Sequence, residues 1–355
     1  MGGAENVLEE FCKIFPQAPI YTSIVDKRKL RESFEGLDIR SSFMQNLPFV
    51  KTQFKKYLPL YPLAFERMQL KGYDCILSMS SSFAKGVSFS GNTLHINYCL
   101  TPMRFAWMFK QYNEKEKIPV YYRPFLSLLL KQFRKWDLEK NKNVHRFITL
   151  STAVQKRISD WYGRKADVIF PPVDTDRFVS EPQAGSKYYL IVSRLRGYKR
   201  IDLAIHACNK LAKQLKIVGT GDSEKSLRKI SGNTIEFLGY RSTNDVVKLM
   251  QNCKAFIFPG EEDFGIAPLE AQACGKPVIA YRAGGAIDTV IDKETGVFFD
   301  VPTEGALSNA IVDFEQQQFS TEKCRRNADK FSSKIFQQKI YTYVENALKD
   351  FRSRL

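Results

Sequence analysis

The second half of the chain predicts a doubly wound α/β domain, and two observations carry that prediction. Short apolar runs without polar alternation recur along it, as expected for parallel strands that are buried on both faces. Helical stretches such as Ile201–Lys213 and Asn244–Gln251 separate these runs, which is the pattern of a parallel sheet covered by helices. The predicted strands are Tyr188–Val192, Leu215–Val218, Ile235–Leu238, Ala255–Phe258, Val278–Tyr281 and Val297–Phe299.

The first half repeats this rhythm less regularly, and the whole length of 355 residues suits two domains of about 150 residues each. Pro171–Pro172 stiffens the chain and is typical of a linker. We therefore predict an N-terminal domain over 1–170, a second domain over 171–330, and a C-terminal helix over 331–355 that packs back toward the first domain. The strands predicted in the first half are Ile20–Ser23, Cys75–Ser78, Leu94–Tyr98, Phe147–Leu150 and Asp167–Phe170.

The start of the sequence departs from this rhythm. Gly2-Gly3 leads directly into an apparent helix, Asn6–Phe15, without an apolar strand before it. A Gly-Gly turn into a helix usually follows a strand, because its backbone N–H groups can then face a phosphate. We therefore expect that the first strand of this domain is missing from the sequence; the alternative is a flexible terminus.

The charge is strongly basic and unevenly distributed. The chain has 54 basic and 38 acidic residues, and residues 1–165 alone contain 27 basic and 14 acidic ones. A basic first half indicates an anionic partner such as phosphate or anionic lipid, or else a lysine-rich solvated surface. Seven scattered cysteines without a C-x-x-C pair favour reduced thiols in the cytoplasm. No apolar run approaches the roughly 18–20 residues of a membrane span.

Two acidic residues flank the loop that follows the predicted strand Ala255–Phe258. Glu262 lies on this loop, and Glu270 lies about one turn into the next helix. Carboxylates are natural acceptors for sugar or ribose hydroxyls. Gly265 permits close backbone approach, and the exposed N–H groups of Ile266 and Ala267 can hold an anion. The alternative is an acidic helix start that only complements the helix dipole.

A basic loop follows the strand Tyr188–Val192 and reaches the same sheet edge. It brings two cations, Arg194 and Lys199, to that edge. A nucleotide diphosphate that departs from a sugar needs such charge. The alternative is a basic run that only faces solvent. Because two loops with charged residues reach the same sheet edge, this alternative is less convincing.

Several motifs occur in order along the chain: Gly2-Gly3-Ala4-Glu5, Ser193-Arg194-Leu195 with Lys199, Val218-Gly219-Thr220-Gly221, Phe237-Leu238-Gly239, and the segment from Glu262 through Glu270-Ala271 to Gly275-Lys276-Pro277-Val278-Ile279. Together these motifs resemble the family 4 glycosyltransferases of GT-B fold, and the resemblance covers essentially the whole chain. The stretch Tyr98–Trp107 resembles mannosyltransferases that build bacterial surface polysaccharides.

The resemblance implies two Rossmann-like parallel-sheet domains that face a central cleft, and it implies a role for each matching residue. Arg194 and Lys199 would neutralise the donor diphosphate, Glu262 would contact the transferred sugar, and Glu270 would bind the ribose hydroxyls. The remaining donor-binding residues would be Gly2 and Gly3 facing the diphosphate, Gly239 and Tyr240 at the base, and Phe264, Gly265, Ile266 and Ala267 at the distal phosphate.

The sequence departs from the family pattern at two places. Leu100 stands where the family usually has a histidine, and leucine cannot donate a hydrogen bond to a sugar hydroxyl. The first strand is absent. Both departures raise the alternative of a catalytically impaired homologue that still binds the nucleotide sugar.

Other features of the sequence give weaker evidence of function. Asp174-Thr175-Asp176 resembles a metal-binding pair but follows the two prolines, where turn-forming aspartates are expected. The three histidines, His95, His145 and His206, lack ligand spacing. The aromatic and basic stretches Thr52–Lys71 and Tyr121–Lys135 could contact anionic lipid, or could simply pack on the first domain with their lysines in water.

The expectation is therefore a retaining hexosyltransferase without a metal or other cofactor. It would move mannose from GDP-mannose to a glycan or lipid-linked saccharide in surface polysaccharide synthesis, with UDP-sugar as the alternative donor. We expect a cytoplasmic protein, peripheral at the inner face of the cell membrane at most, and no nucleic acid partner because no such motif accompanies the charge.

Overall fold

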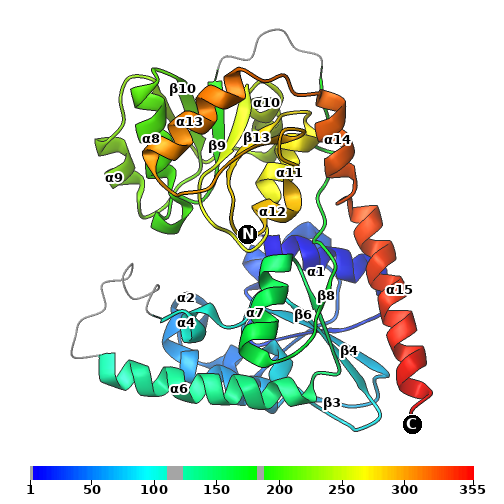
Figure 1. Cartoon of the computed structure of the whole chain (residues 1–355). Coiled ribbons are helices and arrows are strands. Elements are labelled where there is room, and N and C mark those ends of the chain that lie inside the picture. Colours follow the sequence, from blue (N-terminus) through cyan, green and yellow to red (C-terminus); the bar gives the residue numbers. More distant parts are fainter. Residues whose placement is uncertain (1–2, 110–122, 182–187) are drawn as a thin grey trace. The chain divides into compact units, whose positions relative to one another are not determined.

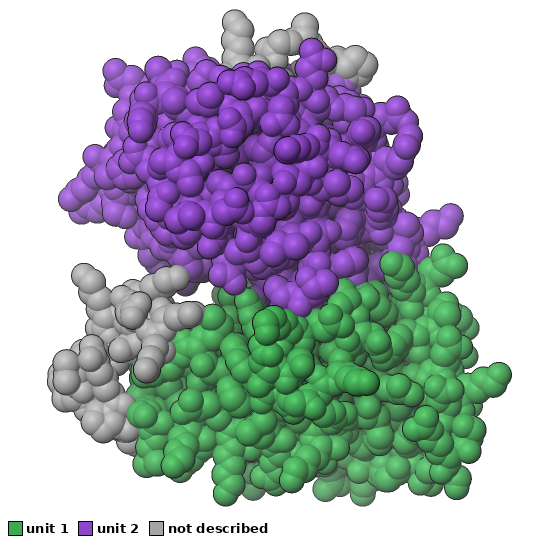
Figure 2. Space-filling view, viewed as in Figure 1, with its two compact units in different colours: residues 1–150, 154–169, 337–355 green, residues 151–153, 170–336 purple. Residues whose placement is uncertain are grey.

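The computed structural model describes residues 3–109, 123–181 and 188–355, and the chain divides into two compact units (Figures 1 and 2). Unit 1 comprises residues 1–150, 154–169 and 337–355, and unit 2 comprises residues 151–153 and 170–336. Apart from residues 151–153, the chain enters unit 2 at 169/170 and leaves it at 336/337. The boundaries predicted from sequence were 170/171 and 330/331.

Unit 2 is built on a six-stranded parallel sheet with the strand order β11-β10-β9-β12-β13-β14. Every neighbouring pair runs parallel, so each connection must cross over a face of the sheet. The strands are β9 (Tyr188–Val192), β10 (Gln214–Val218), β11 (Ile235–Gly239), β12 (Ala255–Phe258), β13 (Val278–Tyr281) and β14 (Gly296–Phe299). The order corresponds to the 3-2-1-4-5-6 arrangement of doubly wound sheets when β9 is counted as the first strand.

Helices cover both faces of this sheet, and the strands supply an apolar side chain to each face in alternation (Figure 1). Tyr189 and Ile191 of β9 pack against α8 (Ile201–Lys210), α9 (Glu224–Lys229) and α13 (Glu304–Glu315). Leu190 of the same strand packs on the opposite face. That face is covered by α10 (Thr243–Gln251), α11 (Ile266–Ala273), α12 (Ala286–Thr289) and α14 (Thr321–Asp329). Burial on both sides explains why these strands are continuous apolar runs in the sequence.

Unit 1 has a second parallel sheet, with the strand order β4-β6-β7-β8, and a separate parallel pair, β1-β2. These strands are β1 (Ile20–Thr22), β2 (Ile39–Ser41), β4 (Cys75–Ser80), β6 (Leu94–Cys99), β7 (Arg146–Thr149) and β8 (Asp167–Val168). A further short pair joins β3 (Gln69–Leu70) to β5 (Ser88–Phe89). The two-domain α/β architecture predicted from the sequence is confirmed.

The helices of unit 1 pack around these strands and around a core that is rich in aromatic residues. The α-helices are α1 (Gly3–Ile14), α2 (Val50–Gln53), α3 (Tyr61–Glu66), α4 (Arg104–Trp107), α6 (Arg123–Lys140), α7 (Thr152–Tyr162) and α15 (Ser333–Arg352), the last of which begins in unit 2. The 3-10 helix η4 (Phe54–Leu60) joins α2 to α3. No helix in the described ranges is both long enough and apolar enough to cross a bilayer.

The structure differs from the sequence prediction mainly where elements are short. The strand predicted over Asp167–Phe170 ends at Val168, since the chain crosses into unit 2 directly after residue 169. β2, β3 and β5 were not predicted. They have two or three residues each, too few for a period-two pattern to be visible.

A buried ion pair ties together helices of unit 1 that are far apart in the sequence. Lys85, which is 3% exposed, lies with its Nζ 2.6 Å from Oδ1 of the fully buried Asp137. Trp107 Nε1 and Tyr162 OH donate to the other oxygen of Asp137 at 2.8 and 2.7 Å, and Lys85 also donates to Asn141 Oδ1 at 2.6 Å. Burial lowers the pKa of Lys85, and the charge of Asp137 opposes that effect. The stability of unit 1 therefore depends on both partners.

Replacing Asp137 by Asn keeps its shape but leaves Lys85 buried without a counter-charge. We expect a loss of about 3–5 kcal/mol in the free energy of unfolding of unit 1. All three tryptophans (Trp107, Trp136 and Trp161) belong to this unit, so tryptophan fluorescence during urea unfolding reports on it alone. Asp160→Asn is the matched control because it breaks the exposed pair with Lys156 and is expected to cost at most about 0.5 kcal/mol. Equal effects of the two variants would contradict the assigned role.

Candidate functional site

The candidate site lies at the carboxyl edge of the unit 2 sheet, at the point where the strand order reverses. β9 and β12 are neighbours in the sheet although two strands separate them in sequence. The helices that follow them therefore go to opposite faces, and the loops between strand and helix diverge and leave a crevice. The basic loop follows β9 and the acidic loop follows β12, so both loops start from this one point.

The structure brings together two of the predicted side chains from the two loops. Lys199, the last residue of the 3-10 helix η8 (Gly197–Lys199), forms an ion pair with Glu262. The side chains are 12% and 24% exposed, so the pair is partly withdrawn from solvent. Arg194 lies five residues earlier on the same loop and is exposed. The loop thus presents one cation that already has a partner and one that faces solvent.

Glycines hold these loops in backbone contact with one another. A side chain at Gly219 or Gly221 would collide with the backbone of Ser193 or Leu195, so the loop after β10 lies directly on the basic loop. At Gly260 a Cβ atom would come within 2.7 Å of Tyr198 O. These close approaches fix the basic loop between the strand ends on both sides.

A second pair of glycines, which the sequence analysis missed, supports the acidic loop. Gly285 N donates a hydrogen bond to Glu262 O at 2.9 Å. A Cβ atom at Gly284 would meet the carbonyl of Glu262, and one at Gly285 would meet the backbone of Phe264. The signal was present in the sequence, because Gly284-Gly285 lies in the loop that follows β13 at the same sheet edge.

The acidic loop ends in the start of α11, whose first backbone N–H groups point out of the helix. Gly265 precedes the helix with φ +88°, a left-handed conformation that suits glycine, and no side chain caps the helix. Ile266 and Ala267 contribute the first two N–H groups, which have no acceptor within the helix. Phe264 is 4% exposed and packs against Phe170 and Phe331. Its side chain anchors the loop, so any donor contact from this residue comes from its backbone.

Glu270 lies in α11 and is half-buried. Burial, and to a smaller extent the nearby charge of Asp174, raise the pKa of its carboxyl to about 7, while the charge of Arg177 opposes this rise. Arg177 N donates to Asp174 Oδ1 at 3.2 Å, and its guanidinium donates to Asn244 Oδ1 at 3.0 Å. The sequence analysis treated Asp174 only as a turn former or metal ligand. Its effect on Glu270 is visible only in the fold.

The predicted base-binding residues lie at the end of β11, two strands away from β9. Gly239 has φ +66°, and the side chain of Tyr240 is 80% exposed. An exposed aromatic ring at a sheet edge can stack on a planar ligand. Gly219 N, in the loop after β10, donates a hydrogen bond to Gly239 O at 2.8 Å. The roles of Gly239 and Tyr240 in binding the base stay a prediction.

The residues predicted in the first domain belong to unit 1. Gly3 begins α1, and Gly2 lies outside the described residues. Leu100 directly follows β6, and its N–H donates to Ser80 O at 3.1 Å. The stretch Thr52–Lys71 covers α2 to β3, whereas Tyr121–Lys135 starts outside the described residues.

The unit 2 site therefore combines features for binding an anion and features for binding hydroxyl groups. Arg194, Lys199 and the start of α11 supply positive charge and outward N–H groups. Glu262 and Glu270 supply carboxylates. Within the described ranges, no group of three or more His, Cys, Asp or Glu side chains could hold a metal ion.

The residues of the unit 2 site lie in a part of the chain that matches a known protein family. Residues 172–331 match the family model of the glycosyl transferases group 1, and this range contains the whole unit 2 site. An uncharacterized glycosyltransferase of Methanocaldococcus jannaschii is 26% identical over 213 residues, which cover 59% of this chain and 60% of that protein.

A GDP-mannose-dependent alpha-(1-6)-phosphatidylinositol monomannoside mannosyltransferase of Mycolicibacterium smegmatis is 28% identical over 195 residues, 46% of this chain and 51% of that one. The chain thus spans between about a half and three fifths of the length of these two relatives.

The similarity to solved structures extends over both units. The crystal structure of Anabaena HepE in complex with UDP has a TM-score of 0.72 and 18% sequence identity, and the match covers 97% of this chain and 96% of that one. At this identity the likeness shows the fold alone. The chain therefore has the GT-B fold of glycosyltransferases, and its residues 172–331 are similar to the glycosyl transferases group 1.

Proposed function

We propose that this protein is a retaining glycosyltransferase that moves a hexose to a glycan or lipid-linked saccharide in surface polysaccharide synthesis. The first candidate for the donor is GDP-mannose, from which mannose would be transferred. The observation that carries the proposal is the ion pair between Lys199 and Glu262 beside the uncapped start of α11. A pyrophosphate fits the charge of this arrangement, and a sugar hydroxyl fits the carboxylate. The proposal requires no metal or other cofactor.

The donor would replace one partner of the ion pair. Its diphosphate would take Lys199 and Arg194 as counter-charges, with the distal phosphate at the N–H groups of Ile266 and Ala267. Glu262, once separated from Lys199, would accept a hydrogen bond from a hydroxyl of the transferred hexose. Glu270 would accept hydrogen bonds from the hydroxyl groups of the ribose.

In the transfer itself, the bond between the anomeric carbon and the phosphate oxygen breaks, and the acceptor oxygen bonds to that carbon on the same face. The departing phosphate oxygen takes the acceptor's proton, so no side-chain base is needed. Lys199 and Arg194 act on the charge that develops on the leaving phosphate. Their effect is therefore larger in the transition state than in the bound donor.

Two alternatives keep specific support. A UDP-sugar donor is favoured by the fold similarity to HepE, whose structure contains UDP. A homologue that binds the nucleotide sugar without turnover is favoured by Leu100, which places a side chain without hydrogen-bonding capacity directly after β6. The relative from Mycolicibacterium smegmatis, whose name states a GDP-mannose dependence, supports GDP-mannose as the first donor to test.

The function is tested by following the release of nucleoside diphosphate from GDP-mannose and from UDP-glucose, alongside calorimetric binding of both. We expect release from GDP-mannose, and a loss of about 100-fold or more in the Lys199→Ala variant because the leaving phosphate loses a cation. Lys216→Ala is the matched control, since Lys216 lies within β10 and pairs with Glu236.

Release from UDP-glucose alone would favour the UDP-sugar alternative, and binding without release would favour the impaired homologue. Normal release by Lys199→Ala would exclude the proposed diphosphate site.

Donor binding should depend on pH through Glu270. In the ligand-free protein its pKa is raised to about 7 by burial, whereas the hydroxyl groups of ribose are bound by the ionised carboxylate. Below pH 7 the carboxyl must lose a proton on binding, so the affinity for GDP should fall as the pH decreases from 8 to 6 and should level off above 8.

Glu270→Gln should bind more weakly by about 1–3 kcal/mol at pH 8 and should lose this pH dependence. Asp313→Asn, an exposed carboxylate of α13, is the control. Titration calorimetry at three pH values checks both effects. A Gln variant that keeps the wild-type pH profile would remove Glu270 from the site.

The proposal also includes peripheral contact of unit 1 with an anionic membrane. The segment 43–65 contains Lys51, Lys55 and Lys56 but no acidic residue, and it exposes Phe49 (75%) and Phe54 (47%). Exposed aromatic rings interleaved with lysines suit the headgroup region of a bilayer.

We expect the protein to sediment with phosphatidylserine vesicles at low salt and to be released at high salt. Replacing the three lysines by Ala should weaken binding by about 3 kcal/mol, roughly 1 kcal/mol for each lysine. The control replaces Lys225, Lys229 and Lys248 of unit 2, which are also exposed. Equal losses in both triple variants would indicate net charge rather than this surface.

A further inference from the structure

Three polar side chains that the proposed function does not use are buried together in unit 2. Gln272 and Thr289 are fully buried, and Asn327 is 5% exposed. They come from three helices that cover the same face of the sheet, α11, α12 and α14 (Figure 1). We call these three side chains the buried cluster. A polar group withdrawn from water costs free energy unless it is hydrogen-bonded, so the partners of the buried cluster show which elements it holds together.

The buried cluster converges on one backbone carbonyl group at the end of α12. Thr289 O accepts hydrogen bonds from Gln272 Nε2 and from Asn327 Nδ2, both at 2.9 Å. Asn327 Nδ2 also donates to Gln272 Oε1 at 2.7 Å. The hydroxyl group of Thr289 donates to Gly285 O at 3.1 Å, one turn earlier. The end of α12 is therefore bonded to α11 and to α14 at the same time.

The start of α12 is bonded to the acidic loop. Gly285 directly precedes the helix, and its N–H donates to Glu262 O at 2.9 Å. A Cβ atom at Gly284 would collide with the same carbonyl group, so the two loops touch at this point. α12 has only four residues, too few for a helix that is stable by itself. Its position is therefore set by the contacts at its two ends and by the packing of Ala286 in the core.

The buried cluster thus connects the two carboxylates of the candidate site. Glu270 lies on α11, two residues before Gln272, and Glu262 lies on the loop that Gly285 holds. Hydrogen bonds lead from Gln272 to Thr289, and from there through α12 to the backbone of Glu262. The polypeptide itself closes the ring, because the acidic loop runs directly into α11. Such a ring restricts the spacing between the two carboxylates.

We propose that Asn327 is a positioning residue for the transferred sugar, because it holds the loop of Glu262 in place through the buried cluster. This role rests on the proposed function, in which Glu262 contacts the hexose and Glu270 contacts the ribose. Asn327 acts through Gln272 and Thr289 and lies 55 positions from Gln272 in the sequence. Its side chain should therefore affect the affinity for a nucleotide sugar but not for the nucleoside diphosphate, which has no hexose.

The experiment compares the binding of GDP and of GDP-mannose to the Asn327→Leu variant by titration calorimetry. UDP and UDP-glucose take their place if the wild-type protein binds these instead. Leucine has nearly the shape of asparagine but donates no hydrogen bond, so Thr289 O and Gln272 Oε1 each lose one donor. We expect the affinity for GDP-mannose to fall about tenfold and the affinity for GDP to change less than about twofold. An equal change in both affinities would overturn the proposal.

Asn209→Leu is the matched control in unit 2. Asn209 also forms two hydrogen bonds that leucine cannot form, to Ile230 O at 2.8 Å and from Gly232 N at 3.0 Å. It belongs to α8, which covers the opposite face of the sheet from the buried cluster. This variant should bind both ligands like the wild-type protein. If it loses as much affinity for GDP-mannose as Asn327→Leu, the buried cluster has no special role.

Thr289 provides a second and milder test. Thr289→Val keeps the shape of the side chain but removes the hydroxyl group that donates to Gly285 O, whereas Thr289→Ser keeps this group. We expect Thr289→Val to bind GDP-mannose about threefold more weakly or worse, with GDP binding unchanged, and Thr289→Ser to bind both like the wild-type protein. Equally weak binding of GDP-mannose by both variants would contradict the role of the hydroxyl group.

Hydrogen exchange of the Gly285 amide tests the same inference without a ligand. This amide donates to Glu262 O, and we expect its exchange to be about tenfold faster in Asn327→Leu and in Thr289→Val. Unchanged exchange in both variants would refute the connection between the buried cluster and the acidic loop. A wild-type protein that binds neither nucleotide sugar would contradict the proposed function, and the exchange rate would still decide whether Asn327 positions the loop.

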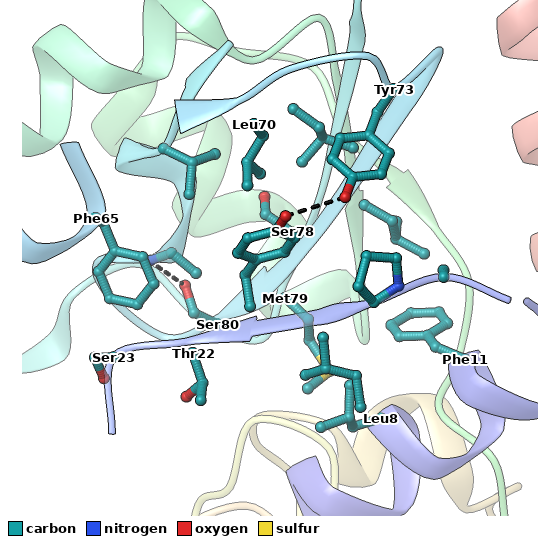
Figure 3. Close-up of a pocket in the computed structure, with 18 of the residues that line it drawn as sticks. Leu8, Phe11, Thr22, Ser23, Phe65, Leu70, Tyr73, Ser78, Met79 and Ser80 are labelled. Carbon is teal, nitrogen blue, oxygen red and sulfur yellow. Dashed lines mark hydrogen bonds between the residues drawn. The ribbon is translucent and has the colours of Figure 1, made fainter. Parts of the chain in front are cut away.

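Thiol labelling distinguishes a local change from a general opening of unit 2. Cys12 and Cys75 are partly exposed and line a cavity of about 460 Å³ in unit 1, together with apolar side chains such as Leu8 and Phe11 (Figure 3). Their rate of reaction with maleimide is the standard for an accessible thiol. The four cysteines of unit 2 are buried, and we expect them to stay protected in both variants. Labelling of these four thiols at the standard rate in both Asn327→Leu and Thr289→Val would overturn the proposal, because the lost affinity would then follow from general opening.

Discussion

The reversal of strand order between β9 and β12 is the constraint on which the candidate site depends. Because these two neighbouring strands send their helices to opposite faces, the loop with Arg194 and Lys199 and the loop with Glu262 leave the sheet side by side. The ion pair between Lys199 and Glu262 follows from that geometry. The ion pair holds the two charges in place before any ligand binds. A ligand with both a phosphate and a hydroxyl group then becomes the new partner of Lys199 and Glu262, and it does not have to order a loop.

The remaining parts of the site act by fixing the backbone of the loops. Glycines at 219, 221, 260, 284 and 285 allow loops from four strands to touch, so their positions are tied to one another. Packing also affects the charge of the site, because it partly buries Glu270. Its carboxylate is kept near its ionisation point by burial and by Asp174, and it gains most from a ligand that supplies hydrogen-bond donors. Close packing therefore both positions the loops and raises the pKa of this carboxyl group.

The two units differ in how completely their sheets are built. In unit 2 every described strand has its neighbours, and helices cover both faces. In unit 1 the parallel order is broken between β1 and β4, and an apolar cavity occupies the break. The buried pair of Lys85 and Asp137 connects η5 (Ala84–Gly86), which follows β4, to α6. It therefore ties the segment after β4 to α6 within this unit.

The sequence by itself determined the fold class, the strands of unit 2 and the two loops that carry Arg194, Lys199, Glu262 and Glu270. Strands buried on both faces must be apolar throughout, and this pattern is local enough to be read residue by residue. Only the tertiary structure decided that Lys199 meets Glu262, that Phe264 is an anchor inside the fold, and that Asp174 acts on Glu270. These contacts depend on strand order and helix packing, which bring together residues up to about a hundred positions apart. A local pattern of side chains cannot encode such distances.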